Sequence, residues 1–187
     1  MNSIIDSRLL VKYVRIVATV MFCIGMQLFA VTCLAGGNET EEKHLSRIEL
    51  PNGIHPVEFT TTTVTIHSAG GVYNFQVEIA ITGPQHRRGL MYRTELAESA
   101  GMLFVYPREH QGRLWMFNTY MPLSVAFADA DGTIFQITDM EPCGELTRAE
   151  CERRAYAAAR PFRFALEINQ GEFTRHGIRV GDRLSYP

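Results

Sequence analysis

Apolar and polar residues alternate most regularly over residues 72–81, and a period of two is the pattern of a β-strand with one buried face. The polar positions are Asn74, Gln76 and Glu78, and the apolar positions are Phe75, Val77, Ile79 and Ile81. Residues 57–66 are rich in β-branched side chains, and residues 68–71 between the two segments have the composition of a turn. We therefore predict a β-hairpin over residues 57–81.

Short apolar segments continue along the rest of the chain, separated by proline, glycine, asparagine and aspartate residues that favour turns. They predict strands at residues 102–106, 113–117, 123–128, 133–138 and 163–169, and a last short strand after residues 181–182. The sequence DADG at 129–132 is typical of the turn in a second hairpin.

Helical signals are fewer. Thr82, Pro84 and Gly89 suit the cap, the first turn and the end of a short helix, and residues 94–98 indicate a single capped turn. The one longer helix begins at the capping box formed by Thr147 and Glu150 and is expected to run to about residue 159. These elements predict a mainly β fold, either a β-sandwich or a partly closed barrel, with one main helix and short helical turns packed at its ends.

The N-terminal segment has a different composition. Arg8, Lys12 and Arg15 precede residues 16–34, which carry no charged side chain, and small residues at 35–37 lead into an acidic stretch. This order is typical of a secretory signal peptide over residues 1–35, so we expect a periplasmic or secreted protein. Two alternatives stay open: an uncleaved inner-membrane anchor through residues 16–34, because the apolar run just reaches the length of a membrane span, and lipid attachment at Cys33.

Residues 36–56 carry charges, proline and glycine with little periodicity, and we interpret them as a linker. Residues 57–187 are then a single β-sandwich domain, which we expect to be a monomer. Eighteen lysine and arginine residues against twenty acidic ones give a net charge of −2, which argues against nucleic-acid binding.

Export changes how the cysteines are interpreted. Two of the four lie in the leader, which leaves Cys143 and Cys151 as an even pair in an oxidising compartment, and we predict a disulfide between them. Two cysteines do not complete a four-ligand zinc site, and their spacing is not that of a redox CxxC motif.

Several short motifs then occur in order along the chain. They are RGLM at 88–91, Arg93, GMLF at 101–104, WM at 115–116, NT at 118–119, PL at 122–123, Asp129 with Gly132, LE at 166–167 with Asn169 and Gly171, and Gly177 with GD at 181–182. Together they resemble the family known as domain of unknown function 192, over residues 57–186. The resemblance implies a compact β-sandwich, often exported in bacteria, with no established activity. Ser124 departs from the pattern, since the family often has an acidic residue there.

Polar residues that interrupt the most apolar segments are the candidate ligand-binding residues. They are Arg88, Arg93, Asn118, Thr119 and Glu167, bordered by Trp115. A buried Arg–Glu pair with a purely structural role would explain some of them. The alternative is a patch that binds a small polar or anionic ligand or an envelope glycan. We therefore expect a non-catalytic ligand-binding or accessory module of the cell envelope, without a metal or a cofactor.

Two other functions remain open. A periplasmic hydrolase of glycans would need two carboxylates facing one groove, and Glu78, Asp129, Asp139 and Glu167 all lie on or beside predicted strands. A copper-binding protein would need converging thioethers or imidazoles, and its candidates are Met91, Met102, Met116, Met121 and Met140. The common hydrolase, metalloprotease and nucleotide-binding motifs are absent from the sequence, so no catalytic residue is assigned.

Overall fold

The computed structural model describes residues 46–48, 54 and 56–187. Residues 43–187 group into one compact unit. The predicted signal peptide or anchor, and most of the predicted linker, lie outside the described residues. Within the part that is described, none of the helices has both the length and the apolar character that crossing a membrane requires.

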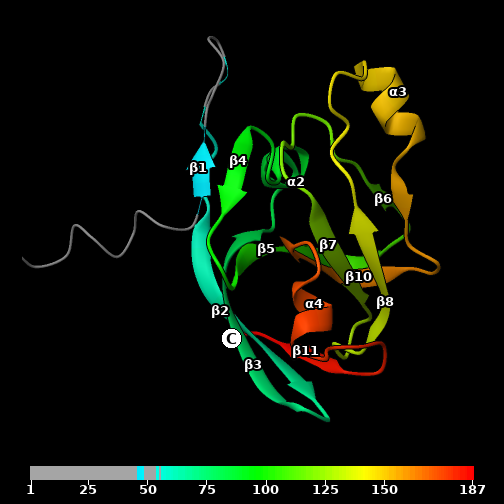
Figure 1. Ribbon diagram of the computed structural model, residues 1–187. Helices are drawn as coiled ribbons and strands as arrows, with labels where there is room; N and C mark the ends of the chain where they lie inside the picture. The colour runs from blue at the N-terminus through cyan, green and yellow to red at the C-terminus, as the bar shows by residue number, and fades with distance from the viewer. Residues whose placement is uncertain (1–45, 49–53, 55) are drawn as a thin grey trace, which may run out of the picture. The chain divides into compact units, whose positions relative to one another are not determined.

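One curled sheet of seven strands forms the centre of this unit (Figure 1). Neighbouring strands are antiparallel, except that β3 and β5 are parallel. In spatial order the strands are β11 (Arg183–Ser185), β2 (Thr60–Ser68), β3 (Gly71–Ala80), β5 (Ala100–His110), β10 (Phe162–Asn169), β7 (Leu123–Ala128) and β8 (Ile134–Met140).

The two edges of the sheet meet at one corner, so that the sheet closes part of a barrel. Thr133 forms a β-bridge with Arg183, and the backbone N–H of Leu184 donates to the carbonyl of Gly132 at 2.8 Å. Gly132 has a φ of +86°, and a Cβ at this position would collide with the Leu184 carbonyl oxygen, so only glycine suits the corner. The predicted mainly β class is therefore confirmed in its second form, the partly closed barrel.

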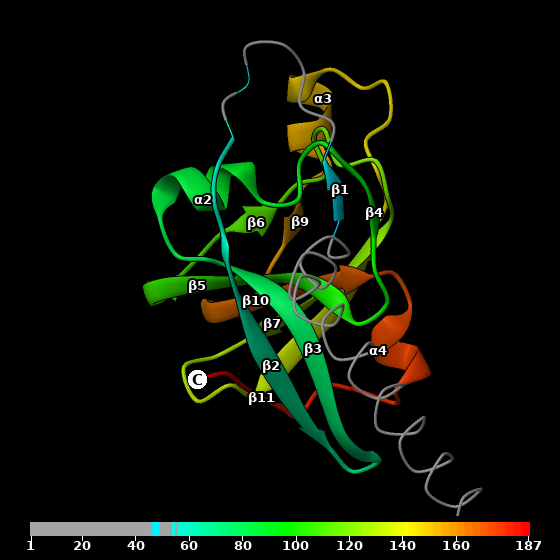
Figure 2. The same ribbon diagram turned by 90° about the vertical axis from the view of Figure 1, so that its left-hand side faces the viewer.

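Smaller elements cover the ends and the outer face of the barrel (Figure 2). Strand β1 (Ser46–Ile48) pairs with β4 (Arg93–Leu96), and β6 (Arg113–Leu114) pairs with β9 (Tyr156–Ala157). The described helices are short: α2 (Gly83–Arg88), α3 (Arg148–Arg153) and α4 (Glu172–Arg175). The parallel pairing of β3 with β5 requires a crossover connection, and α2 lies within it.

Both faces of the sheet are buried. The inner cluster includes Phe75, Val77 and Ile79 from β3 and Phe173 from α4, while the outer cluster includes Met102, Phe104 and other residues. All six residues of β7 are buried, as expected for a strand with packing on both sides. The alternation in residues 72–81 places Phe75, Val77 and Ile79 in the core as predicted, but Ile81 is 54% exposed because β3 ends at Ala80.

Local signals predicted several elements well. Strand β7 has the predicted bounds, both hairpins form, and α2 has Thr82 as its cap in a complete capping box with Gln85. The predicted disulfide between Cys143 and Cys151 is present, with a Cα–Cα distance of 5.6 Å.

Other predictions were wrong in extent or in type. The helix that begins at Thr147 ends near Arg153 and not near residue 159, because Tyr156 and Ala157 pair with β6. Residues 94–98 lie mostly in β4 and not in a capped turn, the strand predicted at 113–117 is paired only over residues 113–114, and α4 was not predicted. Strand β1 lies within the predicted linker. At β1, β4 and residues 156–157, pairing between distant segments overrides the local preference.

Candidate functional site

Two hollows lie beside α2, and they differ greatly in size. The smaller has a volume of about 30 Å³, room for a water molecule or two, and is lined by Pro56, Val57, Phe59, Arg88, Gly89, Met91 and Arg93. The larger has a volume of about 490 Å³, which falls in the range of small-molecule sites. We call it the aromatic pocket, and its lining residues are Gly83, His86, Arg87, Met91, Tyr106, His110, Trp115, Phe117 and Arg148.

The aromatic pocket is built from four separate parts of the chain. Helix α2 supplies His86 and Arg87, strand β5 supplies Tyr106 and His110, the segment after β6 supplies Trp115 and Phe117, and α3 supplies Arg148. The crossover between β3 and β5 places α2 beside the end of β5 (Figure 2). Arg148 is the first residue of α3, and the disulfide between Cys143 and Cys151 closes the loop that carries it.

The imidazole of His86 has a defined tautomer. Its Nε2 atom lies 3.0 Å from the carbonyl oxygen of Ala80 and 3.1 Å from that of Val105. A carbonyl only accepts hydrogen bonds, so Nε2 must carry the proton and donate it. In the neutral ring Nδ1 is then an acceptor, and no group among the described residues donates a hydrogen bond to it. His86 therefore offers a lone pair to a hydroxyl or an amide N–H of a ligand.

Tyr106 contacts two imidazoles. Its ring centroid lies 4.4 Å from that of His86 and 4.3 Å from that of His110, with the second pair stacked at 3°. Burial, aided by the negative charge of Glu167, raises the pKa of Tyr106 to about 12, so the phenol is neutral and can donate. Partial burial and the neighbouring His86 lower the pKa of His110, which is then neutral at pH 7.

Gly112 makes room for His110. A Cβ at position 112 would collide with Nε2 of His110, so the absence of a side chain allows the imidazole to lie where it stacks on Tyr106.

Trp115 forms another wall of the pocket, and it is the only tryptophan in the chain. Its ring stacks near Phe117 with centroids 5.4 Å apart, and the guanidinium of Arg148 lies 5.0 Å from its centroid. The lining contains two arginines, Arg87 and Arg148, and no aspartate or glutamate. The pocket is therefore aromatic, rich in hydrogen-bonding groups and positively charged.

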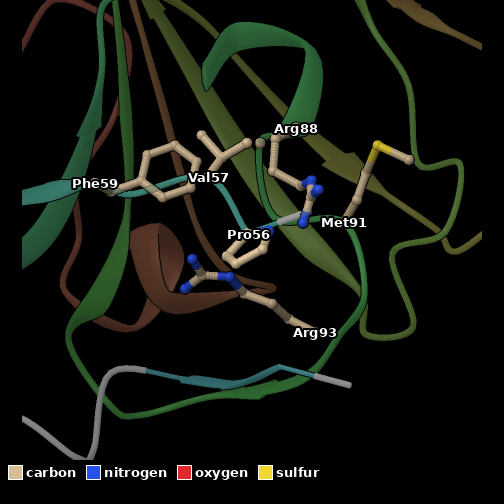
Figure 3. Close-up of a pocket in the computed structure, with 7 residues that line it drawn as sticks. Pro56, Val57, Phe59, Arg88, Met91 and Arg93 are labelled. Atoms are coloured by element: carbon tan, nitrogen blue, oxygen red, sulfur yellow. The ribbon is translucent and has the colours of Figure 1, made fainter. Parts of the chain in front are cut away.

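Most of the residues that the sequence indicated as candidates lie outside this pocket. Arg93 is 1% exposed and forms an ion pair with Glu78 of β3, and its guanidinium lies 5.9 Å from the ring centroid of Phe59. Burial lowers the pKa of Arg93, and the carboxylate of Glu78 opposes this. Figure 3 shows Arg88 and Arg93 at the small hollow, with the Arg93 guanidinium directed toward Phe59. A buried Arg–Glu pair is thus present, with Glu78 as the acid.

Asn118 and Tyr92 are hydrogen-bonded to each other next to the pocket. Both residues have left-handed backbone conformations, with φ of 56° and 67°. The Asn118 amide donates to the Tyr92 hydroxyl at 2.9 Å, and the Tyr92 N–H donates to the Asn118 carbonyl at 2.6 Å. Such strained residues persist only where the surroundings hold them. Their chain neighbours Met91 and Phe117 line the pocket, so these two hydrogen bonds fix the backbone beside two of the lining residues.

Thr119 and Glu167 are buried. Thr119 is 5% exposed, and its N–H donates to the carbonyl of Met116 at 3.2 Å. Glu167 is also 5% exposed and pairs with Met102 of β5 and Val125 of β7 in the middle of the sheet. Burial raises the pKa of Glu167 to about 8. Of the six candidates, Trp115 lines the aromatic pocket, Arg88 and Arg93 line the small hollow, and the remaining three line neither.

Sequence reasoning missed the other residues of the pocket. His110 was not among the candidate residues, and it ends β5 and stacks on Tyr106. One signal was present: residues 106 and 110 are separated by an even number of positions, which favours one face when the strand predicted at residues 102–106 continues to residue 110, as β5 does. No linear pattern links them to Trp115 or Arg148.

The two alternative functions have geometric requirements that can be compared with the structure. Glu78 and Glu167 both pair with Met102, so they flank it on one face of the sheet, but neither lines the hollow or the pocket. Four methionines belong to the outer core cluster and are at most 6% exposed: Met102, Met116, Met121 and Met140. Over the described part of the chain, no three His, Cys, Asp or Glu side chains are grouped so as to hold a metal ion.

Comparison with known proteins places the chain among relatives of similar fold. A crystal structure from Sinorhizobium meliloti 1021, described as a "putative transcription regulator", is 33% identical with a TM-score of 0.62, covering 71% of this chain and 98% of that one. A protein of unknown function from Novosphingobium aromaticivorans DSM 12444 is 30% identical with a TM-score of 0.60, covering 80% of this chain and 99% of that one. None of the curated proteins matches the chain.

The family model described as uncharacterized ACR matches residues 64–186, which include every residue of the aromatic pocket. This match bears out the resemblance carried by the short sequence motifs. The chain belongs to the DUF192 family.

Proposed function

We propose that this protein is a non-catalytic binding module and that the aromatic pocket is its ligand site. The observation that supports this most directly is the pocket itself, about 490 Å³ in volume, where Trp115, Phe117 and Tyr106 offer flat apolar surface. His86 adds a hydrogen-bond acceptor of defined tautomer beside them. Sites of this kind bind small molecules with a ring and a few polar groups.

Export to the cell envelope is part of the proposal. The disulfide between Cys143 and Cys151 supports it, because structural disulfides persist in oxidising compartments. The basic, apolar and small-residue order of residues 1–37 supports it as well. In this setting the protein acts as an accessory module that captures a small polar or anionic compound or a piece of envelope glycan.

The lining of the pocket favours binding over hydrolysis. It contains neither a carboxylate pair nor a serine or cysteine beside a base, which are the groups that hydrolytic mechanisms use. Copper binding has less support, because four of the five candidate methionines are buried in the core and Met91 is the one that lines the pocket. The S. meliloti relative is described as a "putative transcription regulator", and in this chain a net charge of −2 does not support nucleic-acid binding.

A ligand-screening melt tests the proposal. The purified exported protein is heated with a panel of sugars, sugar acids, aromatic acids and phosphate esters, and a ligand is expected to raise the Tm. His110→Ala should abolish the increase in Tm, because His110 lines the pocket. His110 is exposed, so the substitution should leave the core intact. His67→Ala, an exposed histidine on β2, is the matched control and should retain it. The proposal fails if no compound stabilises the protein or if both variants respond equally.

A further inference from the structure

We infer that the ligand of the aromatic pocket is an acidic sugar, a hydroxyl-bearing ring with a carboxylate that Arg87 and Arg148 recognise. This inference rests on the proposed function and specifies the class of ligand.

The charge of the pocket is the first argument. Arg87 and Arg148 both line it, no acidic side chain does, and neither guanidinium forms an ion pair within the described part of the chain. Arg160 provides a contrast elsewhere on the surface. It also lies over an aromatic ring, at 4.1 Å from the centroid of Phe135, but its charge is paired with Asp129 at 2.8 Å. Arg148 has the same kind of stacking without the carboxylate, so a ligand can supply it.

The hydrogen-bonding groups of the pocket are the second argument. His86 presents an acceptor because its other nitrogen is committed to two backbone carbonyls, and Tyr106 keeps its hydroxyl proton as a donor. A ring with several hydroxyls satisfies an acceptor and a donor at once. The faces of Trp115 and Phe117 complement the apolar C–H face of such a ring, and an aromatic acid would leave most of the polar groups unpaired.

The position of Arg148 is the third argument. It is held between the capping box of Thr147 and Glu150 and the disulfide that anchors Cys151 in the core. The backbone of Arg148 is therefore fixed, and its guanidinium lies 5.0 Å from the ring centroid of Trp115. As a result, less conformational freedom is lost when an anion binds to it. Reduction of the disulfide should loosen this wall and weaken the binding of acids more than that of neutral sugars.

The fluorescence of Trp115 provides the assay, because the chain has no other tryptophan. The intact protein is titrated with three matched pairs: galacturonate and galactose, glucuronate and glucose, and N-acetylmuramate and N-acetylglucosamine. In a pair that binds, the acid should bind about tenfold more tightly than the neutral sugar, as expected for charge-assisted hydrogen bonds. The preference should shrink with added salt.

Variants assign the preference to residues. Arg87→Gln and Arg148→Gln should each weaken the binding of the acid by about fivefold more than the binding of the neutral sugar, and so remove most of the preference. Arg160→Gln is the matched control and should behave like the wild type. Equal affinity within every pair, or equal effects of the variants on both members, would overturn the inference and leave the proposed function standing. If none of the six sugars binds, the acidic-sugar inference fails, while the proposed function fails only if the wider panel also leaves the Tm unchanged.

Discussion

Glu167→Gln is the substitution whose effect on stability can be calculated most directly from the structure. Glu167 is 5% exposed in the middle of the sheet, and burial raises the pKa of its carboxyl from 4.5 to about 8. In the unfolded chain the same group titrates near its ordinary value. Between these two values the folded protein holds a proton that the unfolded chain has released.

This difference makes the protein less stable as the pH rises. Stability increases with pH only where the unfolded state binds more protons, and here the folded state binds more. The contribution of Glu167 is therefore fully present below about pH 4.5 and is lost progressively up to about pH 8. Each pKa unit corresponds to about 1.4 kcal/mol, so the loss over this interval amounts to roughly 3 to 5 kcal/mol. A glutamine of the same shape stays neutral and does not show this loss.

Urea unfolding followed by far-UV circular dichroism between pH 5 and pH 9 measures the effect. Histidines and other carboxylates also titrate, so the quantity of interest is the difference between the wild type and Glu167→Gln at each pH. This difference should be small at pH 5 and should favour the variant by about 3 to 5 kcal/mol at pH 9. Glu98→Gln, at a carboxylate that is 78% exposed, is the matched control and should follow the wild type. A difference that stays constant with pH would refute the reasoning.

Two further predictions concern the support of the pocket. Replacing Cys143 and Cys151 by serine should lower the free energy of unfolding by roughly 2 to 3 kcal/mol, because the bond between residues eight positions apart no longer restricts the unfolded chain. Chemical denaturation measures this difference, and the reduced wild type serves for comparison. An unchanged free energy of unfolding would contradict the prediction. Asn118→Ala should cost about 1 to 3 kcal/mol, because it removes the hydrogen bond to Tyr92 and keeps a residue with a Cβ at positive φ. Asn118→Gly loses the same bond but tolerates the backbone, so it should be more stable than the alanine variant; the reverse order in thermal melts would contradict the argument.

The parts of the fold that were predicted correctly depend on short stretches of sequence. Strand β7, the two hairpins and α2 each carry their own periodicity, turn or cap within about ten residues. Residues 154–159 are different. Their alanines favour a helix, but Tyr156 and Ala157 pair with β6, some forty residues earlier in the chain, and a partner at that distance leaves no local mark.

The site was predicted less well for the same physical reason. Trp115 was identified because it borders the polar candidates in the sequence, whereas Arg148 reaches the pocket only because a disulfide-closed loop places α3 over Trp115. Arg93 attracted attention as a charge in an apolar segment, and the structure places it in an ion pair with Glu78 on β3. A charge next to apolar residues indicates that a partner exists, but the topology of the sheet decides whether that partner is a side chain or a ligand.

The central claim is that a ligand occupies the aromatic pocket, and the indole N–H of Trp115 tests it most directly. As the single tryptophan, Trp115 gives one indole cross-peak in a ¹H–¹⁵N correlation spectrum. Titration with the acidic sugar that gives the largest stabilisation should shift this peak saturably, with the same Kd as the fluorescence titration, and His110→Ala should suppress the shift. Saturable shifts elsewhere in the spectrum, with the indole peak of Trp115 unmoved, would contradict the assignment of the pocket as the binding site.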